Sequence, residues 1–131
     1  MNHEEATVRA FILPTKRERY LGFLSNKNGR TKFSLELAHF KSLNPMYIVP
    51  ILPSHQNSSL IAKILTAKGA GPKCWVISAD PKFDGQEMDL DAALRETIGR
   101  GMGTIISCIP GELAYFEDED FRCILQRERQ A

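Results

Sequence analysis

The residues best suited to chemistry are carboxylates in an acidic segment that follows a predicted strand. Asp80, Asp84, Glu87 and Asp89 come soon after the apolar run 74–77, and loops at the carboxyl ends of strands often bind ligands in α/β folds. Clustered carboxylates could hold Mg²⁺, but their spacing does not match an EF-hand loop. Because aspartates also favour turns and helix caps, we expect no metal site, and we keep Asp80 and Glu87 as candidate catalytic residues.

The glycine-rich segment 99–103 is a second candidate, because backbone N–H groups in such loops can cradle a phosphate. Arg100 could add a positive charge there. Phosphate loops normally run from a strand into a helix, whereas this segment is predicted to run from a helix into a strand. We therefore expect Gly99 to end the helix and the other glycines to form a turn. Loops 80–89 and 99–103 together define the alternative hypothesis, an enzyme that acts on a phosphate-containing or acyl substrate.

Ser107 and Cys108 are the candidate nucleophiles, with His39 or His55 as the general base. Nucleophilic catalysis needs the base within hydrogen-bond reach, and the sequence around Ser107 is not a G-x-S-x-G nucleophile elbow. Burial in an apolar strand would raise the pKa of Cys108 and make its thiol unreactive. His55 lies in a polar loop, so it is the histidine that we keep among the catalytic candidates.

The three cysteines, Cys74, Cys108 and Cys123, are expected to be buried, unpaired thiols. Their wide, uneven spacing fits no zinc or redox motif, and an odd number of scattered cysteines is typical of a reducing compartment. No signal-peptide pattern is present, and no apolar run reaches the roughly 18 residues of a membrane span. We expect a cytoplasmic protein with no membrane association and no cofactor.

Positive charge gathers early in the chain and negative charge late. Residues 1–41 hold eight Lys and Arg against four Asp and Glu, whereas residues 86–131 hold five against ten. The cations within residues 16–32 could bind nucleic-acid phosphates, but no helix-turn-helix, zinc-finger, RRM or KH pattern accompanies them. Weak nucleic-acid binding through this basic N-terminal third is therefore a second alternative, which we do not favour. The opposite charges could also complement each other across a two-fold axis, which indicates a possible homodimer.

Apolar residues at helical spacing predict helices through the first half of the chain. We expect helices at residues 5–13, from Pro14 to residue 24, from a cap at Thr31 to Asn44, and from a cap at Ser58 to Gly69. Residues 5–13 also fit strand alternation, and we favour the helix. Residues 45–57 carry three prolines and predict an irregular crossing loop.

The second half predicts strands at 74–77, 104–109, 113–117 and 122–127, with a helix capped by Asp89 between the first two. Trp75 in the first strand is expected to anchor the core. The last strand is expected at a sheet edge, where its apolar middle could pair with a second copy. The predicted fold is α+β (α/β), a single domain over 1–131. N-terminal helices precede a strand, a helix and a three-stranded antiparallel meander in one mixed sheet.

One segment resembles a known group of proteins. The pattern GMGT-x-x-SCIPG-x-LAYFE, which covers residues 101–117, is similar to the C-terminal part of a family of small uncharacterised bacterial proteins, and the similarity extends back over 74–94. The resemblance implies a stand-alone bacterial domain and assigns no catalytic residue. Because each chemical motif has a simple structural explanation, we favour a domain that binds a protein partner or a small ligand without catalysis.

Overall fold

A six-stranded antiparallel sheet lies between two layers of helices. The computed structural model describes residues 2–127, and its strands follow the order β1-β6-β5-β4-β2-β3. The strands are β1 (Ile48–Pro50), β2 (Lys73–Ser78), β3 (Gln86–Asp89), β4 (Thr104–Ile109), β5 (Leu113–Glu117) and β6 (Arg122–Gln126). This architecture confirms the predicted α+β class.

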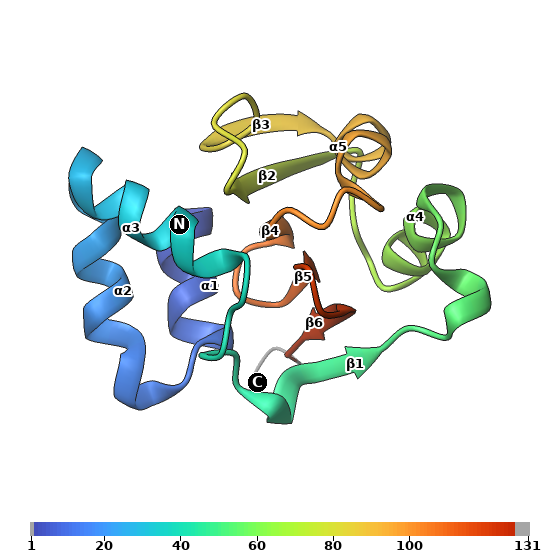
Figure 1. Ribbon diagram of the computed structural model, residues 1–131. Helices are drawn as coiled ribbons and strands as arrows, with labels where there is room; N and C mark the ends of the chain where they lie inside the picture. Colours follow the sequence, from blue (N-terminus) through green and yellow to red (C-terminus); the bar gives the residue numbers. More distant parts are fainter. Residues whose placement is uncertain (1, 128–131) are drawn as a thin grey trace.

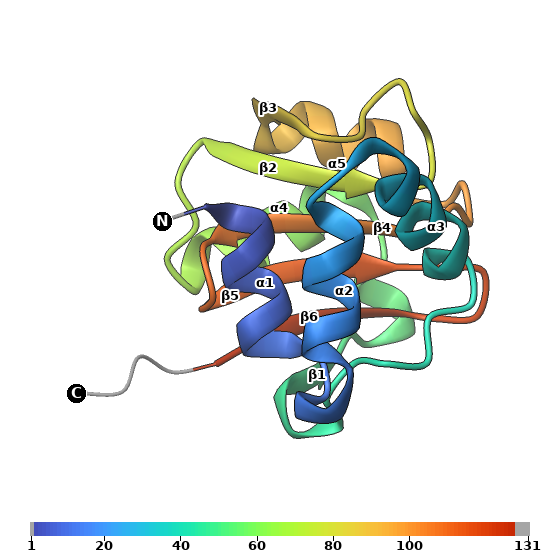
Figure 2. The same cartoon turned by 90° about the vertical axis from the view of Figure 1, so that its left-hand side faces the viewer.

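The helices divide between the two faces of the sheet, as Figures 1 and 2 show. One face carries α1 (His3–Phe11), α2 (Arg17–Leu24) and α3 (Lys27–Leu37). The other carries α4 (Ser58–Ala67) and α5 (Leu90–Thr97). Three short 3₁₀ turns, η1 (Pro14–Lys16), η2 (Pro45–Tyr47) and η3 (Pro53–His55), connect these elements. Among the described residues, no helix is both long enough and apolar enough to cross a membrane.

Strand alternation distributes the core between the two faces. Ile105, Phe116 and Leu125 pack against the α1–α3 layer, whereas Ile106 and Tyr115 pack against α4 and α5. Because helices cover both faces, β5 is buried along its whole length. Trp75 is only partly buried against the α1–α3 cluster, so the prediction that it anchors the core holds in a weaker form.

Asparagine side chains begin three of the helices. Asn2 accepts hydrogen bonds from the first turn of α1, Asn26 accepts one from Gly29, and Asn57 accepts one from Leu60. The predicted caps at Thr31 and Ser58 were therefore wrong. Asn26 has the extended backbone and the short acceptor side chain that an N-cap requires, and α3 begins four residues before Thr31.

The sheet contains no parallel pair among its described strands, so its predicted mixed character was wrong. The reason is β3, which the sequence did not reveal. A single helix between β2 and β4 would make a parallel crossover. Instead, β3 forms a hairpin with β2 and reverses the chain before α5, and β4 returns antiparallel to β2.

The last strand does not lie at an edge, which corrects a premise of the homodimer prediction. Within the described chain, β6 pairs with β5 on one side and with β1 on the other. The two edges are β1 and β3, and both resist pairing with another strand. In β1, Ile48 already donates its N–H to Pro45, and Pro50 has no N–H to donate. In β3, Glu87 and Asp89 would face like charges in a two-fold pairing.

Candidate functional site

The four candidate catalytic residues do not meet in one hollow. Asp80 accepts a hydrogen bond from the Lys82 backbone at 2.9 Å, as a turn residue does. Glu87 lies on the edge strand β3, and His55 lies in η3. Arg100 pairs with Glu96 at 3.1 Å, and the hollow beside Arg100 is lined by none of Asp80, Glu87 and His55. The start of the acidic turn and the end of the glycine loop are joined by a backbone hydrogen bond of 2.8 Å from Ala79 to Gly103.

The glycine loop already binds an anion, and that anion is the carboxylate of Glu117. Gly99 donates its N–H to both carboxylate oxygens at 3.2 Å, and Gly101 donates to one of them at 3.1 Å. The Tyr115 hydroxyl donates at 2.9 Å, and Arg122 forms an ion pair at 3.1 Å. Glu117 is completely buried. Positive φ angles of 88° and 68° at the two glycines allow the loop to wrap around the carboxylate. These N–H groups are therefore occupied and are not offered to a phosphate.

The acidic turn is also engaged within the molecule. Arg30 on α3 lies between two carboxylates and donates to Asp84 at 2.7 and 3.1 Å and to Glu4 at 2.6 Å. Asp84 accepts a further hydrogen bond from the Ser78 backbone at 2.9 Å, and Glu4 accepts one from the Trp75 indole at 2.9 Å. The cluster joins α1, α3 and the β2–β3 turn, so Asp84 acts as a structural residue.

Charge and burial oppose each other in this cluster. Burial raises the pKa of Glu4. Hydrogen bonds from Arg30 and Trp75, together with the attraction of the guanidinium, lower it by more than burial raises it, so the pKa lies below its ordinary value. The hydrogen bond to Glu4 in turn raises the pKa of Arg30. Both groups are therefore held in their charged forms.

A histidine does lie beside Ser107, but it is one that the sequence did not suggest. His3 Nδ1 is 2.8 Å from Ser107 Oγ, and the imidazole stacks on Trp75 with ring centroids 6.3 Å apart. Burial lowers the pKa of His3, which favours the neutral form that a general base requires. Ser107 is completely buried in the sheet, however, so a substrate has no path to its hydroxyl. This pair anchors the start of α1, and only folding reveals it because 104 residues separate its members.

The other predicted nucleophile and base are separated in the fold. Cys108 is buried, and burial raises the pKa of its thiol to about 12. His39 follows the end of α3 and contacts Glu119 at 3.1 Å and Asp120 at 3.3 Å. Cys74 and Cys123 are buried free thiols as well, so the predicted state of all three cysteines is confirmed.

Several cations of the basic N-terminal third are used in intramolecular contacts. Arg19 pairs with Glu36 at 2.6 Å, Arg30 binds the two carboxylates described above, and Arg17 donates to the Ile12 carbonyl at 3.3 Å. A phosphate backbone would have to compete with these partners. The structure therefore offers fewer free cations for nucleic acid than the sequence suggests.

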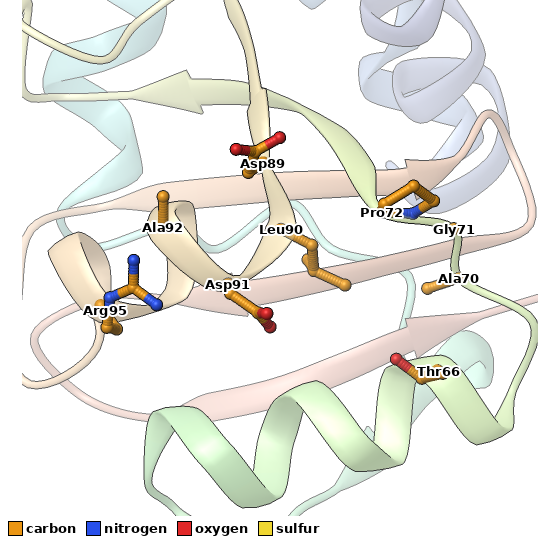
Figure 3. Close-up of a pocket in the computed structure, with 9 residues that line it drawn as sticks. All are labelled: Thr66, Ala70, Gly71, Pro72, Asp89, Leu90, Asp91, Ala92 and Arg95. Atoms are coloured by element: carbon orange, nitrogen blue, oxygen red, sulfur yellow. The ribbon is translucent and has the colours of Figure 1, made fainter.

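A groove between α4 and α5 is open to a ligand. It consists of two hollows of about 540 and 660 Å³ that share Thr66, Asp91 and Arg95. We call this surface, formed by residues 58–67, 70–72 and 89–95, the α4–α5 groove. Figure 3 shows the Asp91 side chain of α5 and the Thr66 side chain of α4 directed into the space between the two helices. The rest of the lining combines small apolar residues such as Ala62 and Ala70 with two serines, Ser58 and Ser59, and with charged side chains.

The charges of the groove lack partners within the described part of the chain. Lys63 on α4 and both Asp91 and Arg95 on α5 are exposed, and none of them forms an ion pair with another described residue. Asp89 differs, because Lys73 pairs with it at 2.6 Å. The groove therefore presents two free cations, one free carboxylate and the hydroxyls of Ser58, Ser59 and Thr66 beside small apolar residues. Sequence reasoning missed it because α4 was interpreted only through its apolar stripe.

Comparisons of this chain with protein-family models, with curated proteins and with solved structures found no match. Within residues 2–127, no three His, Cys, Asp or Glu side chains are placed to share a metal ion. The α4–α5 groove is therefore the surface of this chain that best suits a ligand.

Proposed function

We propose that this chain is a non-catalytic binding domain and that the α4–α5 groove binds a segment of a partner protein. One observation supports this most directly: Lys63, Asp91 and Arg95 surround a hollow surface without an intramolecular partner among the described residues. The carboxylates proposed for catalysis, by contrast, either have structural partners or lie apart. Enzyme sites gather polar groups in a concave pocket that encloses the substrate, whereas this groove is open and elongated, as suits a peptide segment.

Two further points belong to the proposal. Buried free thiols suit a reducing compartment, so we propose a cytoplasmic location. A homodimer remains a prediction, and since neither sheet edge favours pairing, it would have to form through a helical surface. Light scattering at micromolar concentration tests it, because a mass near that of one 14.8 kDa chain at all concentrations would exclude a dimer.

The binding function can be tested by photo-crosslinking followed by measurement with purified components. A photoreactive residue at Thr66 should capture a partner, and a residue at the same kind of exposed site on α3, Lys32, should not. The captured protein is then purified and its affinity measured. The variant Ala67→Trp, which fills the groove from an exposed helix position without adding charge, should weaken binding by about tenfold or more, whereas Lys32→Trp should not. Equal affinities for the two variants would contradict the proposal.

A further inference from the structure

The charge of the α4–α5 groove indicates what kind of segment it binds. Lys63 and Arg95 come from opposite walls, one from α4 and one from α5, and both line the hollow of about 660 Å³. Asp89 is neutralised by Lys73, so Asp91 is the one remaining carboxylate among the charged residues that line the groove. The free charge of the groove is therefore positive, although the lining contains both signs.

We infer that the groove recognises an acidic peptide segment, with a Glu or Asp side chain held between Lys63 and Arg95. This inference rests on the proposed binding function. A guanidinium offers a planar pair of N–H donors that matches a carboxylate, and a lysine opposite it adds a third donor. Among the described residues, Lys63 and Arg95 line one hollow together with a single unpaired carboxylate, Asp91, so an incoming carboxylate balances the charge of that hollow.

The remaining polar groups favour a peptide over a free carboxylate ion. Asp91 and Thr66 belong to both hollows, and they lie next to the proposed carboxylate position along the groove. A carboxylate and a hydroxyl are acceptors for N–H groups, which a peptide backbone supplies and a simple carboxylate does not. The hollow of about 540 Å³ beyond them gives the chain room to continue past Ala70.

The test uses four small probes and nuclear magnetic resonance of the full chain. The probes are the blocked pentapeptide Ala-Ala-Glu-Ala-Ala, its Gln and Lys counterparts, and propionate, which carries the carboxylate without a peptide backbone. The Glu peptide should shift the amide signals of α4 and α5 in a saturable way. The Gln and Lys peptides and propionate should each bind about tenfold more weakly.

Charge reversal provides the decisive variant. Lys63→Glu combined with Arg95→Glu should abolish binding of the Glu peptide and create binding of the Lys peptide. Both positions are exposed, so the fold should survive, and an unchanged amide spectrum outside the two helices verifies this. Lys32→Glu, at an exposed position of α3, is the matched control, since α3 covers the other face of the sheet (Figure 2), and it should change neither preference.

The different outcomes of this experiment show whether the acidic preference or the binding function itself is wrong. Equal binding of the Glu, Gln and Lys peptides would overturn the acidic preference and leave the groove as a peptide site. Propionate binding as tightly as the Glu peptide would show a small-carboxylate site instead. Amide shifts in α4 and α5 that depend on protein concentration alone would make a second copy the occupant. Absence of any shift with the Glu peptide up to about 10 mM would overturn the inference, while the crosslinking experiment would still decide the proposed function.

Discussion

Arg30→Met tests whether one side chain fastens three parts of the fold together. The guanidinium donates four hydrogen bonds to two carboxylates, with side chains exposed by 25% at Arg30, 12% at Glu4 and 14% at Asp84. Removing one partner of a buried ion pair costs roughly 3–5 kcal/mol, because an unpaired charge is left behind. A quarter of the Arg30 side chain stays in contact with water, so we expect the lower end of that range, about 3 kcal/mol. Methionine keeps a similar length and a similar helix propensity.

The measurement is urea unfolding followed by circular dichroism, with Arg9→Met as the control. Arg9 also pairs with a glutamate on α1, at 3.0 Å, but its side chain is 58% exposed. Exposed pairs contribute about 0–1 kcal/mol, so the control should lose less than about 1 kcal/mol. If Arg30→Met lowers the free energy of unfolding no more than the control does, Arg30 does not hold α1, α3 and the β2–β3 turn together.

The pH dependence of the same variant supplies a second check. The folded pKa of Glu4 lies below its ordinary value of 4.5, so the stability that Glu4 adds is present above that value and is lost as the pH falls through the folded pKa. Without Arg30, burial acts with less opposition and raises the pKa of Glu4. As the pH falls, Glu4 in the variant therefore takes up a proton, and the cost of a buried, unpaired charge disappears. The difference between wild type and variant should therefore be largest near pH 7 and shrink toward pH 4. A difference that stays constant over this range would contradict the argument.

Three further predictions address other parts of the core. Ellman's reagent should label none of the three thiols quickly in the native protein, and, because burial raises each thiol pKa to about 12, the free energy of unfolding should fall as the pH rises above 9. Glu117→Gln should cost on the order of 3 kcal/mol and speed amide exchange in the loop 99–103, since an amide NH₂ would then face donors; unchanged exchange would argue against the cradle. Gly103→Ala should destabilise by about 1–3 kcal/mol, because a Cβ there overlaps the Leu37 backbone. The control Gly22→Ala, which meets no atom within 4 Å in the middle of α2, should be neutral or stabilising.

The sequence predicted the elements whose periodicity is strong. The helix stripe of residues 58–69 and the apolar runs 104–109 and 113–117 correspond closely to α4, β4 and β5, because burial imposes a repeating pattern on such elements. The two missed strands lack that pattern. β1 contains Pro50 within a proline-rich segment, and β3 is polar and exposed along most of its length. Each is stabilised by its neighbour in the sheet, which a local pattern cannot show.

The same limit explains why the candidate site could not be predicted from the sequence. Composition and spacing identify which side chains can bind an anion or a proton, but they do not show which of them another part of the chain already occupies. The glycine loop is an anion cradle, as its residue types suggest, and Glu117 fills it from a strand that follows later in the chain. His3 and Ser107 form the contact expected of a base and a nucleophile, yet the sheet encloses the serine.

The uneven charge of the chain can be understood in the same terms. Early cations and late carboxylates were expected to complement each other between two copies, but some of the early cations are already paired within one chain. Arg19 pairs with Glu36, and Arg30 pairs with Glu4 and Asp84, all of which lie outside the acidic residues 86–131. Charge asymmetry along the sequence is therefore weak evidence for a dimer here, since part of the early positive charge is neutralised inside the molecule. Lys63 and Arg95 form none of these ion pairs, because each lies on the α4–α5 face while the acidic turns lie elsewhere. That separation is why an external carboxylate is the partner we assign to them.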